Sequence, residues 1–304
     1  MNNLRKSTLA YLEILENQSV LNLLKKHWIN NHENIKNREE FVEDFFTYLL
    51  SVKNNDEISV QGIKKYYNKK LKEHENENLQ LEFPGDMFVD ILQDELEGIE
   101  AILDFGCGKL AFLKNITDKY SSIEKLIGID PKSQPILENL DSRIEFFRDL
   151  KNVPENSIDL VTIKLVLHHL ENDEEIKNIF VELRRVLRST GKIVVFEESF
   201  SENKIEIGDI GKYLARFDLE LANTTEDFLK LSKEEKVQFL FLNDWLMNLQ
   251  NKYMPWTMQY KSMEEWTGLA ESKDFQKQSA HFLGAIRHRK RKQGMTAMLV
   301  FNKT

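Results

Sequence analysis

A run of small and acidic residues near position 105 has the spacing of a ligand-binding turn. Ala101–Gly108 reads A-I-L-D-F-G-C-G, a buried strand that ends near Asp104 and leads into Gly106 and Gly108. Glycine lets the backbone turn tightly and come close to a ligand. With Ala111, the two glycines also satisfy the G-x-G-x-x-A pattern of dinucleotide-binding proteins. The turn therefore predicts a nucleotide-like ligand without identifying its class.

A second carboxylate follows the next apolar run. Leu126–Ile129 has the composition of a short strand, and Asp130 comes directly after it. Ligands of open α/β sheets bind at the carboxyl ends of the strands, so an acid here can accept hydrogen bonds from the ribose hydroxyls of an adenosine. Proteins that bind NAD and proteins that bind S-adenosylmethionine are both expected to have such an acid, and the two remain open at this point.

Short β-type runs alternate with helical stretches from about residue 100 onward. The runs are Ala101–Phe105, Leu126–Ile129, Ile144–Phe147, Ile158–Ile163 and Ile193–Phe196. This alternation predicts a parallel sheet covered by helices. A helical stripe precedes the fifth run, and Gly191 is expected to end that helix in a left-handed conformation. Two later runs, Ala280–Ile286 and Thr296–Phe301, flank the basic segment Arg287–Lys292 and suit an antiparallel hairpin at the sheet edge.

The rest of the chain is predicted to be helical. Residues 1–98 show apolar residues at helical spacing and no comparable strand candidate. Residues 200–262 are also helical in pattern and end in a stretch rich in tryptophan and tyrosine. We expect a helical N-terminal domain over residues 1–98, a sheet domain over residues 99–304, and a helical lid inserted at about residues 200–262.

Further blocks distinguish between the two kinds of ligand. Asp149 follows the third run. It is followed by V-P-E-N-S-I-D-L-V-T-I-K at Val153–Lys164 and by L-V-L-H-H-L at Leu165–Leu170. The last block is L-R-R-V-L-R-S-T-G-K-I-V-V-F-E-E-S at Leu183–Ser199. In the order and spacing of these blocks, residues 98–200 resemble class I, Rossmann-like methyltransferases that use S-adenosylmethionine. The resemblance is strongest to the small-molecule branch that includes ubiquinone and menaquinone biosynthesis enzymes. It implies an α/β fold with a seven-stranded, mostly parallel sheet.

The resemblance implies a role for each matching residue of the cofactor site. The implied cofactor-binding residues are Asp104, Phe105, Gly106, Cys107, Gly108, Asp130, Pro131, Asp149, Leu150 and Lys164. Asp104 and the turn after it would hold the methionine part of the cofactor. Asp130 would bind the ribose, with Pro131 and Lys132 beside the adenine. Asp149 would accept a hydrogen bond from the adenine amine, while Leu150 covers the ring.

The chain departs from the family pattern at two positions. Relatives often have a small residue where Lys164 stands, and its backbone lines the methionine end of the cofactor, so the resemblance gives the lysine side chain no role. A glycine is common in place of Leu110, which we interpret as a difference in helix packing. Cys107 is expected to fill a tight loop, because methyl transfer from a sulfonium needs no nucleophile from the enzyme.

Catalytic and substrate-binding residues are less closely defined. Of the pair His168 and His169, His169 is the preferred general base, and Glu198 is preferred over Glu197 as the acid that faces the pocket at the end of the fifth run. Candidates for contact with a planar or cationic substrate are Tyr67, Tyr213, Trp256 and Tyr260. Aromatic residues at helical spacing commonly belong to the core, so packing is the alternative for each of them.

Composition limits the partners and the compartment. With 42 basic and 50 acidic residues and a net charge of −8, the chain lacks the basic excess typical of proteins that bind duplex nucleic acid. The single cysteine excludes an intrachain disulfide, and the seven histidines lack the spacing of a metal site, so no metal is expected. No signal-like N-terminus and no apolar run of membrane-spanning length is present, which favours a cytoplasmic protein without membrane association.

We therefore predict an S-adenosylmethionine-dependent methyltransferase that acts on a small-molecule acceptor by in-line transfer, as a monomer or homodimer. Two alternatives stay open: an enzyme that uses S-adenosylmethionine for alkyl transfer or cyclisation, and a non-catalytic scaffold that binds the cofactor. Methylation of RNA or protein is disfavoured by the acidic balance and by the lack of an N/D-P-P-Y/F block after the fourth run.

Overall fold

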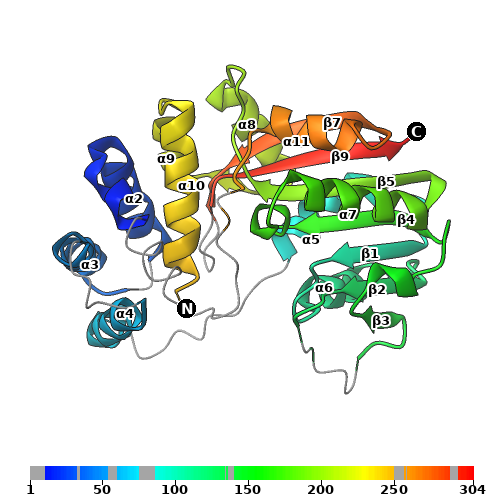
Figure 1. The fold of residues 1–304 in the computed structure, drawn as a ribbon, viewed down its shortest axis with the longest axis horizontal. Helices are drawn as coiled ribbons and strands as arrows, with labels where there is room; N and C mark the ends of the chain where they lie inside the picture. The colour runs from blue at the N-terminus through cyan, green and yellow to red at the C-terminus, as the bar shows by residue number, and fades with distance from the viewer. Residues whose placement is uncertain are drawn as a thin grey trace. The chain divides into compact units, whose positions relative to one another are not determined.

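The computed structural model divides the chain into two compact units, each built from separate stretches of sequence (Figure 1). It describes residues 11–32, 35–53, 60–74, 86–133, 135, 140–249, 257, 259–287 and 294–304. The helical unit comprises Met1–Phe83, Leu219–Trp256 and Gly284–Met295, and the sheet unit comprises Pro84–Asp218, Thr257–Leu283 and Thr296–Thr304.

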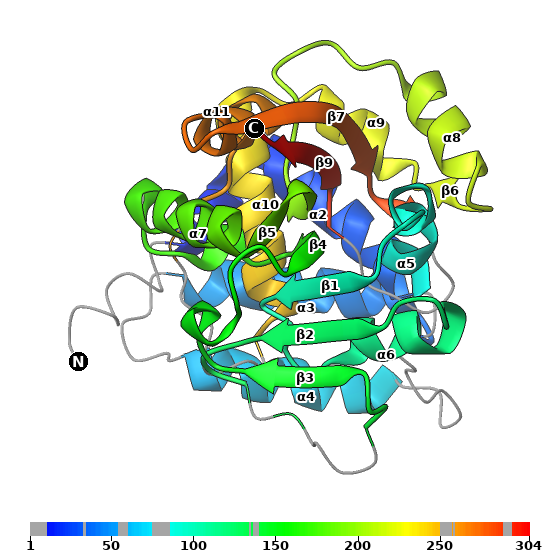
Figure 2. The same ribbon diagram turned by 90° about the vertical axis from the view of Figure 1, so that its right-hand side faces the viewer.

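A seven-stranded sheet with the order β3-β2-β1-β4-β5-β9-β7 forms the centre of the sheet unit (Figure 2). Its strands are β1 (Ala101–Phe105), β2 (Lys125–Ile129), β3 (Ile144–Phe147), β4 (Ile158–Lys164), β5 (Leu187–Glu198), β7 (Phe275–Gly284) and β9 (Thr296–Lys303). The first five pair in parallel, and β9 runs antiparallel to β5. β1 and β4 are apolar runs that are almost wholly buried, as expected at the centre of a parallel sheet. The predicted mostly parallel sheet with an antiparallel C-terminal addition is confirmed.

Helices connect and cover these strands. The sheet unit contains α5 (Asp86–Leu92), η2 (Gln93–Glu95), α6 (Ala111–Lys119), η3 (Leu150–Asn152), η4 (Leu167–His169), α7 (Asp173–Val186), α8 (Ile207–Ala215) and α11 (Met263–Glu271). α7 shows how the sequence defines such an element. The side chain of Asn172 accepts a hydrogen bond from the N–H of Glu175, acidic residues occupy the first turn, and Arg184 and Arg185 lie in the last.

The helical unit has its own aromatic core. It contains η1 (Tyr11–Glu16), α2 (Gln18–Asn31), α3 (Arg38–Val52), α4 (Val60–His74), α9 (Thr224–Leu229), α10 (Lys233–Met247), and the short strands β6 (Glu220–Leu221) and β8 (Ile286–Arg287). Trp28 of α2 is fully buried, stacks on Phe45 and donates a hydrogen bond to the Asn243 side chain of α10 (Nε1–Oδ1 3.2 Å). Among the described helices, none combines the length and apolarity needed to cross a membrane.

The unit boundaries differ from the predicted ones. The sequence predicts a boundary at residue 98, but α5 belongs to the sheet unit, where Phe88 packs against Phe196 of β5 with ring centroids 4.9 Å apart. The predicted insertion at residues 200–262 is divided, because Leu219–Trp256 joins the N-terminal helices through packing of α10 on α2. The proposed cap and lid roles of these helices stay predictions.

Gly191 does not end a helix, so that prediction is wrong. α7 ends at Val186, and Leu187 already has extended dihedral angles (φ −69°, ψ 138°), so the chain passes directly into β5. Gly191 lies within β5 and is not left-handed. Its lack of a side chain still matters, because a Cβ there would lie 2.8 Å from Cδ2 of Leu187 and 2.9 Å from the carbonyl oxygen of Arg188.

The C-terminal strands are connected by a longer excursion than a simple hairpin turn. β7 ends at Gly284, whose φ of 64° redirects the chain, and β8 then pairs antiparallel with β6 in the helical unit. The basic segment predicted as the loop, Arg287–Lys292, lies outside the described residues apart from the backbone of Arg287.

Candidate cofactor site

Two left-handed glycines shape the turn after β1. Gly106 has φ 78° and Gly108 has φ 53°, and the N–H groups of Gly106 and Cys107 donate to the carbonyl of Ile129 (2.7 and 3.1 Å). A Cβ on Gly106 would lie 2.2 Å from Cγ2 of Val166 in the segment after β4. A Cβ on Gly108 would meet no atom within 4 Å. The turn is thus tightly packed on one side and open on the other, as a ligand cradle requires.

Asp104 is buried at the end of β1 with only one of its carboxylate oxygens satisfied. Its side chain accepts a hydrogen bond at Oδ1 from the hydroxyl of Thr162 in β4 (2.8 Å), whereas Oδ2 has no hydrogen-bond partner among the residues that the structure describes. Burial raises the pKa of this carboxyl, while the positive charge of Lys164 and the Thr162 bond oppose the rise. Because a buried unpaired oxygen is costly, the site fits the amino group of a ligand.

Asp130 connects the loops that follow β1 and β2. Its Oδ2 accepts a hydrogen bond from the N–H of Gly108 (3.0 Å), and Oδ1 accepts from the N–H groups of Lys132 (2.9 Å) and Ser133 (2.7 Å). The sequence pattern implies only a ribose-binding role and misses this one. An ionised carboxylate has about four lone-pair sites, so a hydroxyl donor can still be accepted. Asp130 can therefore organise the turn and bind a ribose.

The remaining cofactor candidates lie along the same edge of the sheet, because the carboxyl ends of β1, β2 and β3 meet there. Phe105 is half-buried at the end of β1, and Pro131 is exposed after β2. Asp149 is exposed after β3 and caps η3, where its side chain accepts from the N–H of Lys151 (3.0 Å). Leu150 is buried beside it. The structure thus brings the predicted residues together without testing their contacts with a ligand.

Lys164 adds a positive charge to this edge. It is the last residue of β4, and its Nζ lies 4.1 Å from the centre of the Phe112 ring in α6. Lys164 and Thr162 share a face of β4, and Thr162 contacts Asp104 on that face. The Lys164 side chain is therefore close enough to interact electrostatically with Asp104. The resemblance did not predict this interaction.

Leu110 departs from the family pattern in backbone conformation as well as in packing. It precedes α6 with φ 66°, in the left-handed region that glycine adopts without cost. For leucine this conformation costs roughly 1–2 kcal/mol. Leu110 is fully buried, and a Cβ on Gly128 would lie 2.4 Å from its Cδ2. The leucine side chain thus fills the space that Gly128 leaves, so an explanation from helix packing alone is incomplete.

Glu197, near the end of β5, holds the segment that follows β4. The side chain is fully buried, and Oε1 accepts hydrogen bonds from the N–H groups of Val166 (2.7 Å) and Leu167 (2.6 Å), while Oε2 bonds to Nδ1 of His168. Leu165, at the start of the segment, has φ 56°, a strained conformation of the kind that gathers at functional sites. Since Val166 packs on the cofactor turn, Glu197 supports that turn from β5.

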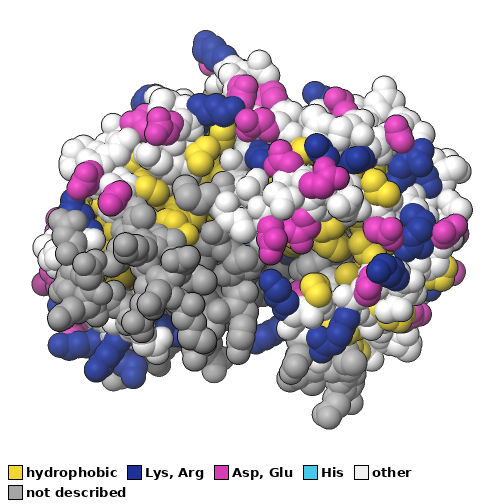
Figure 3. Space-filling view, in the orientation of Figure 1, with side chains coloured by type: hydrophobic (Ala, Val, Ile, Leu, Met, Phe, Trp, Pro, Cys, Tyr) yellow, Lys and Arg dark blue, Asp and Glu magenta, His cyan; other side chains and the backbone are white. Residues whose placement is uncertain are grey.

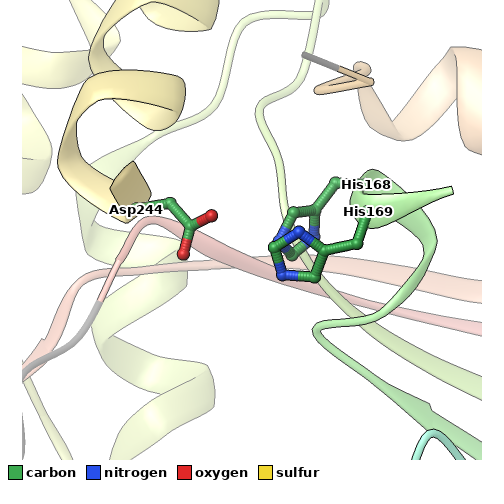
Figure 4. A group of neighbouring side chains, drawn as sticks. All are labelled: His168, His169 and Asp244. Carbon is green, nitrogen blue, oxygen red and sulfur yellow. The ribbon is translucent and has the colours of Figure 1, made fainter. Parts of the chain in front are cut away.

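The histidine pair lies on η4, directly after this segment (Figure 4). His168 is buried, with its ring 3.9 Å from that of partly exposed His169 and stacked on Tyr260 at 5.0 Å between centroids. The sequence pattern favours His169 and Glu198, but the structure joins His168 to Glu197. Neighbouring residues of a strand face opposite sides, but Glu197 and Glu198 are both buried, so burial does not distinguish them and only the contacts of Glu197 do. The roles of His169 and Glu198 stay predictions.

The aromatic substrate candidates occupy different surroundings. Tyr67 lies in the core of the helical unit with its ring 5.2 Å from that of Phe45, so packing accounts for it. Tyr213 of α8 stacks on His281 of β7 at 4.1 Å, and burial raises the pKa of Tyr213 to about 12. Trp256 lies outside the described residues. Of the three candidates that the structure describes, Tyr260 is the one that stacks on His168.

We expect Cys107 to resist alkylation in the folded protein. Its side chain is buried, and burial, followed by the charges of Asp104 and Asp130, raises the pKa of its thiol. Because the thiolate is the reactive form, little of it is present even at mildly alkaline pH. Mass spectrometry after iodoacetamide treatment should find Cys107 unmodified in native buffer and modified in concentrated urea. Rapid modification in native buffer would contradict this expectation.

Part of the chain is similar to known proteins. Residues 103–195 match the model of a family described as a methyltransferase domain. No curated protein sequence matches the chain. Similar solved structures include a proposed O-methyltransferase from Nostoc punctiforme, with 16% identity over 72% of this chain and 56% of that chain and a TM-score of 0.45. Another is the mitomycin 7-O-methyltransferase, with 12% identity over 88% of this chain and 67% of that chain and a TM-score of 0.47. A third is the 1,6-didemethyltoxoflavin N1-methyltransferase of Burkholderia thailandensis with bound S-adenosylhomocysteine. It has 12% identity over 72% of this chain and 78% of that chain, and a TM-score of 0.44.

The family match covers the segment from β1 into β5, which includes the turn, Asp104, Asp130 and the histidine pair. The chain spans 56% of the length of the Nostoc protein. None of these comparisons singles out the ubiquinone and menaquinone branch, which stays a prediction. The part of the sheet that runs from β1 into β5 is therefore similar to a methyltransferase domain.

Proposed function

We propose that this chain transfers the methyl group of S-adenosylmethionine to a small-molecule acceptor. The observation that carries the proposal is the sheet edge at which Asp104, the Gly106–Gly108 turn and Asp130 come together. The buried acid can take the amino group of the cofactor, and the open side of the turn leaves room for its chain. Asp130 retains the capacity to accept a ribose hydroxyl.

When bound, S-adenosylmethionine supplies a methyl group that its sulfonium already activates for displacement. The residues of the chain therefore have to bind the two reactants, align them and exclude water. Alignment of two reactants can contribute up to roughly 7–11 kcal/mol to lowering a barrier. No nucleophile from the protein is required, in keeping with the buried and unreactive environment of Cys107.

An acceptor that keeps its proton at neutral pH also needs a base, and His168 is the best supported one. We assign the ring proton of His168 to Nδ1, which then donates to Oε2 of Glu197. The neutral ring then accepts a proton at Nε2, as in triads where a buried carboxylate orients a histidine. His169 and Glu198 remain the alternative pair proposed from the sequence. An acidic phenol or carboxylate would need neither.

The charge distribution supports a small acceptor rather than a nucleic acid. On the face shown in Figure 3, Lys and Arg side chains are interspersed with Asp and Glu over the described surface. Together with the net charge of −8, this favours neither phosphate steering nor duplex binding. A cytoplasmic location and a monomeric or homodimeric state remain part of the proposal.

Calorimetric titration with S-adenosylmethionine and, separately, with NADH tests the proposed cofactor. We expect the unaltered chain to bind S-adenosylmethionine, and Asp130→Ala to weaken binding roughly tenfold to a hundredfold, as loss of a hydrogen bond to a charged group predicts. Asp118→Ala is the matched control, because Asp118 is an exposed acid on α6. Tighter binding of NADH, or an equal loss in both variants, would argue against the proposal.

Product analysis separates methyl transfer from other uses of the cofactor. Methyl transfer yields S-adenosylhomocysteine and a methylated acceptor, whereas transfer of the aminocarboxypropyl group yields methylthioadenosine. Accumulation of methylthioadenosine would favour the alternative chemistry, and binding without any product would favour a scaffold.

A further inference from the structure

The resemblance gives the side chain of Lys164 no role, but its surroundings suggest one. Its Nζ lies 4.1 Å from the centre of the ring of Phe112, the second residue of α6. The ammonium therefore contacts a side chain from the first turn of the helix that follows the cofactor turn. A positive charge close to this turn favours an anionic group on a ligand bound there.

The opposite charge lies on the neighbouring strand. Asp104 of β1 and Thr162 of β4 are register partners, and Lys164 follows Thr162 by two residues on the same face. The charge of Lys164 acts on the Asp104 carboxyl, which is 1% exposed and has an unsatisfied Oδ2 among the described residues. One side of the sheet therefore presents a carboxylate and an ammonium close to the same turn.

We propose that the Lys164 ammonium binds the α-carboxylate of the amino-acid end of S-adenosylmethionine while Asp104 binds its α-ammonium. This assignment rests on the proposed function. The amino-acid end carries both charges on one carbon, and a pair of opposite side-chain charges on adjacent strands matches it. The side chain of Lys164 thus acts in cofactor recognition, beyond the backbone role that the resemblance implies.

Decarboxylated S-adenosylmethionine is the sharpest probe, because it differs from the cofactor only in lacking the carboxylate. By calorimetry, we expect the unaltered chain to bind it roughly tenfold to a hundredfold more weakly than S-adenosylmethionine, the effect of one charge-assisted hydrogen bond. In Lys164→Met, which keeps an apolar stem against Phe112, the two ligands should bind with equal affinity. Lys164→Arg should retain the preference, and Lys114→Met, at an exposed lysine of α6, should leave it unchanged.

The outcomes distinguish failure of the Lys164 assignment from failure of the proposed function. If Lys164→Met weakens both ligands equally, or affects neither, Lys164 acts on Asp104 or on folding and the assignment is overturned while the proposed function stands. If the unaltered chain binds neither ligand, both fall. Thermal unfolding of Lys164→Met and Lys164→Arg shows whether each variant is folded, and the two-ligand comparison in the unaltered chain bears on the carboxylate contact without any substitution.

Discussion

Replacing Glu197 by glutamine is expected to lower kcat by roughly 10²- to 10⁴-fold for an acceptor that must lose a proton, which is the range that general-base catalysis contributes. The substitution keeps the size of the side chain. Its amide oxygen can still accept from the N–H groups of Val166 and Leu167. Its NH₂ group, however, then faces Nδ1 of His168.

The reason for the large effect is the tautomer of His168. An NH₂ donor requires Nδ1 to accept, so the ring proton moves to Nε2, and Nε2 can no longer take a proton from the acceptor. Affinity for S-adenosylmethionine should change little, because the backbone bonds that hold the segment against the cofactor turn survive. A large fall in kcat with an almost unchanged dissociation constant is therefore the expected signature.

The tautomer of His168 can be measured without knowing the acceptor. The ¹⁵N chemical shifts of selectively labelled histidines report which ring nitrogen carries the proton, so the tautomer change can be observed directly. Glu198→Gln is the matched control at the neighbouring acid. If Glu198→Gln changes the histidine signals or kcat more than Glu197→Gln does, His168 is not the base, and the result favours the pair His169 and Glu198 proposed from the sequence.

The sheet could be predicted from the sequence because its central strands are buried on both faces. β1, β2 and β4 are short, mostly apolar and largely buried runs, and such runs indicate strands without knowledge of their neighbours in the sheet. Gly191 shows the limit of this local signal. A glycine that follows a helical pattern gives the same sequence signal whether it ends the helix or lies in the next strand. Only the register of the strands distinguishes these two positions.

The site was predictable as a location but not in its internal contacts. Acids at the ends of β1 and β2 indicate the ligand edge, whereas the hydrogen bonds that Asp130 accepts from three backbone N–H groups depend on how two loops meet. The choice between His168 and His169 depends on which side chain turns toward Glu197. Long-range packing, which joins residues 219–256 to the N-terminal helices, is likewise absent from the local pattern.

Gly106→Ala is expected to be the most damaging single-methyl change in the cofactor turn. The new Cβ would lie 2.2 Å from Cγ2 of Val166, and φ of 78° is unfavourable for any residue with a side chain. The left-handed conformation costs roughly 1–2 kcal/mol, and overpacking adds roughly 1–3 kcal/mol. We therefore expect a loss of about 2–5 kcal/mol in the free energy of unfolding, together with loss of S-adenosylmethionine binding.

Gly108→Ala separates the two contributions, because Gly108 is also left-handed (φ 53°) but its Cβ would meet no atom within 4 Å. It should lose only the conformational part, about 1–2 kcal/mol. Combining Gly106→Ala with Val166→Ala should recover part of the loss, since the closest contact is removed while one at 3.2 Å to the Val166 Cβ remains. Urea unfolding gives these free energies, and equal losses in the two glycine variants would show that the contact with Val166 contributes nothing and that conformation alone requires the glycines.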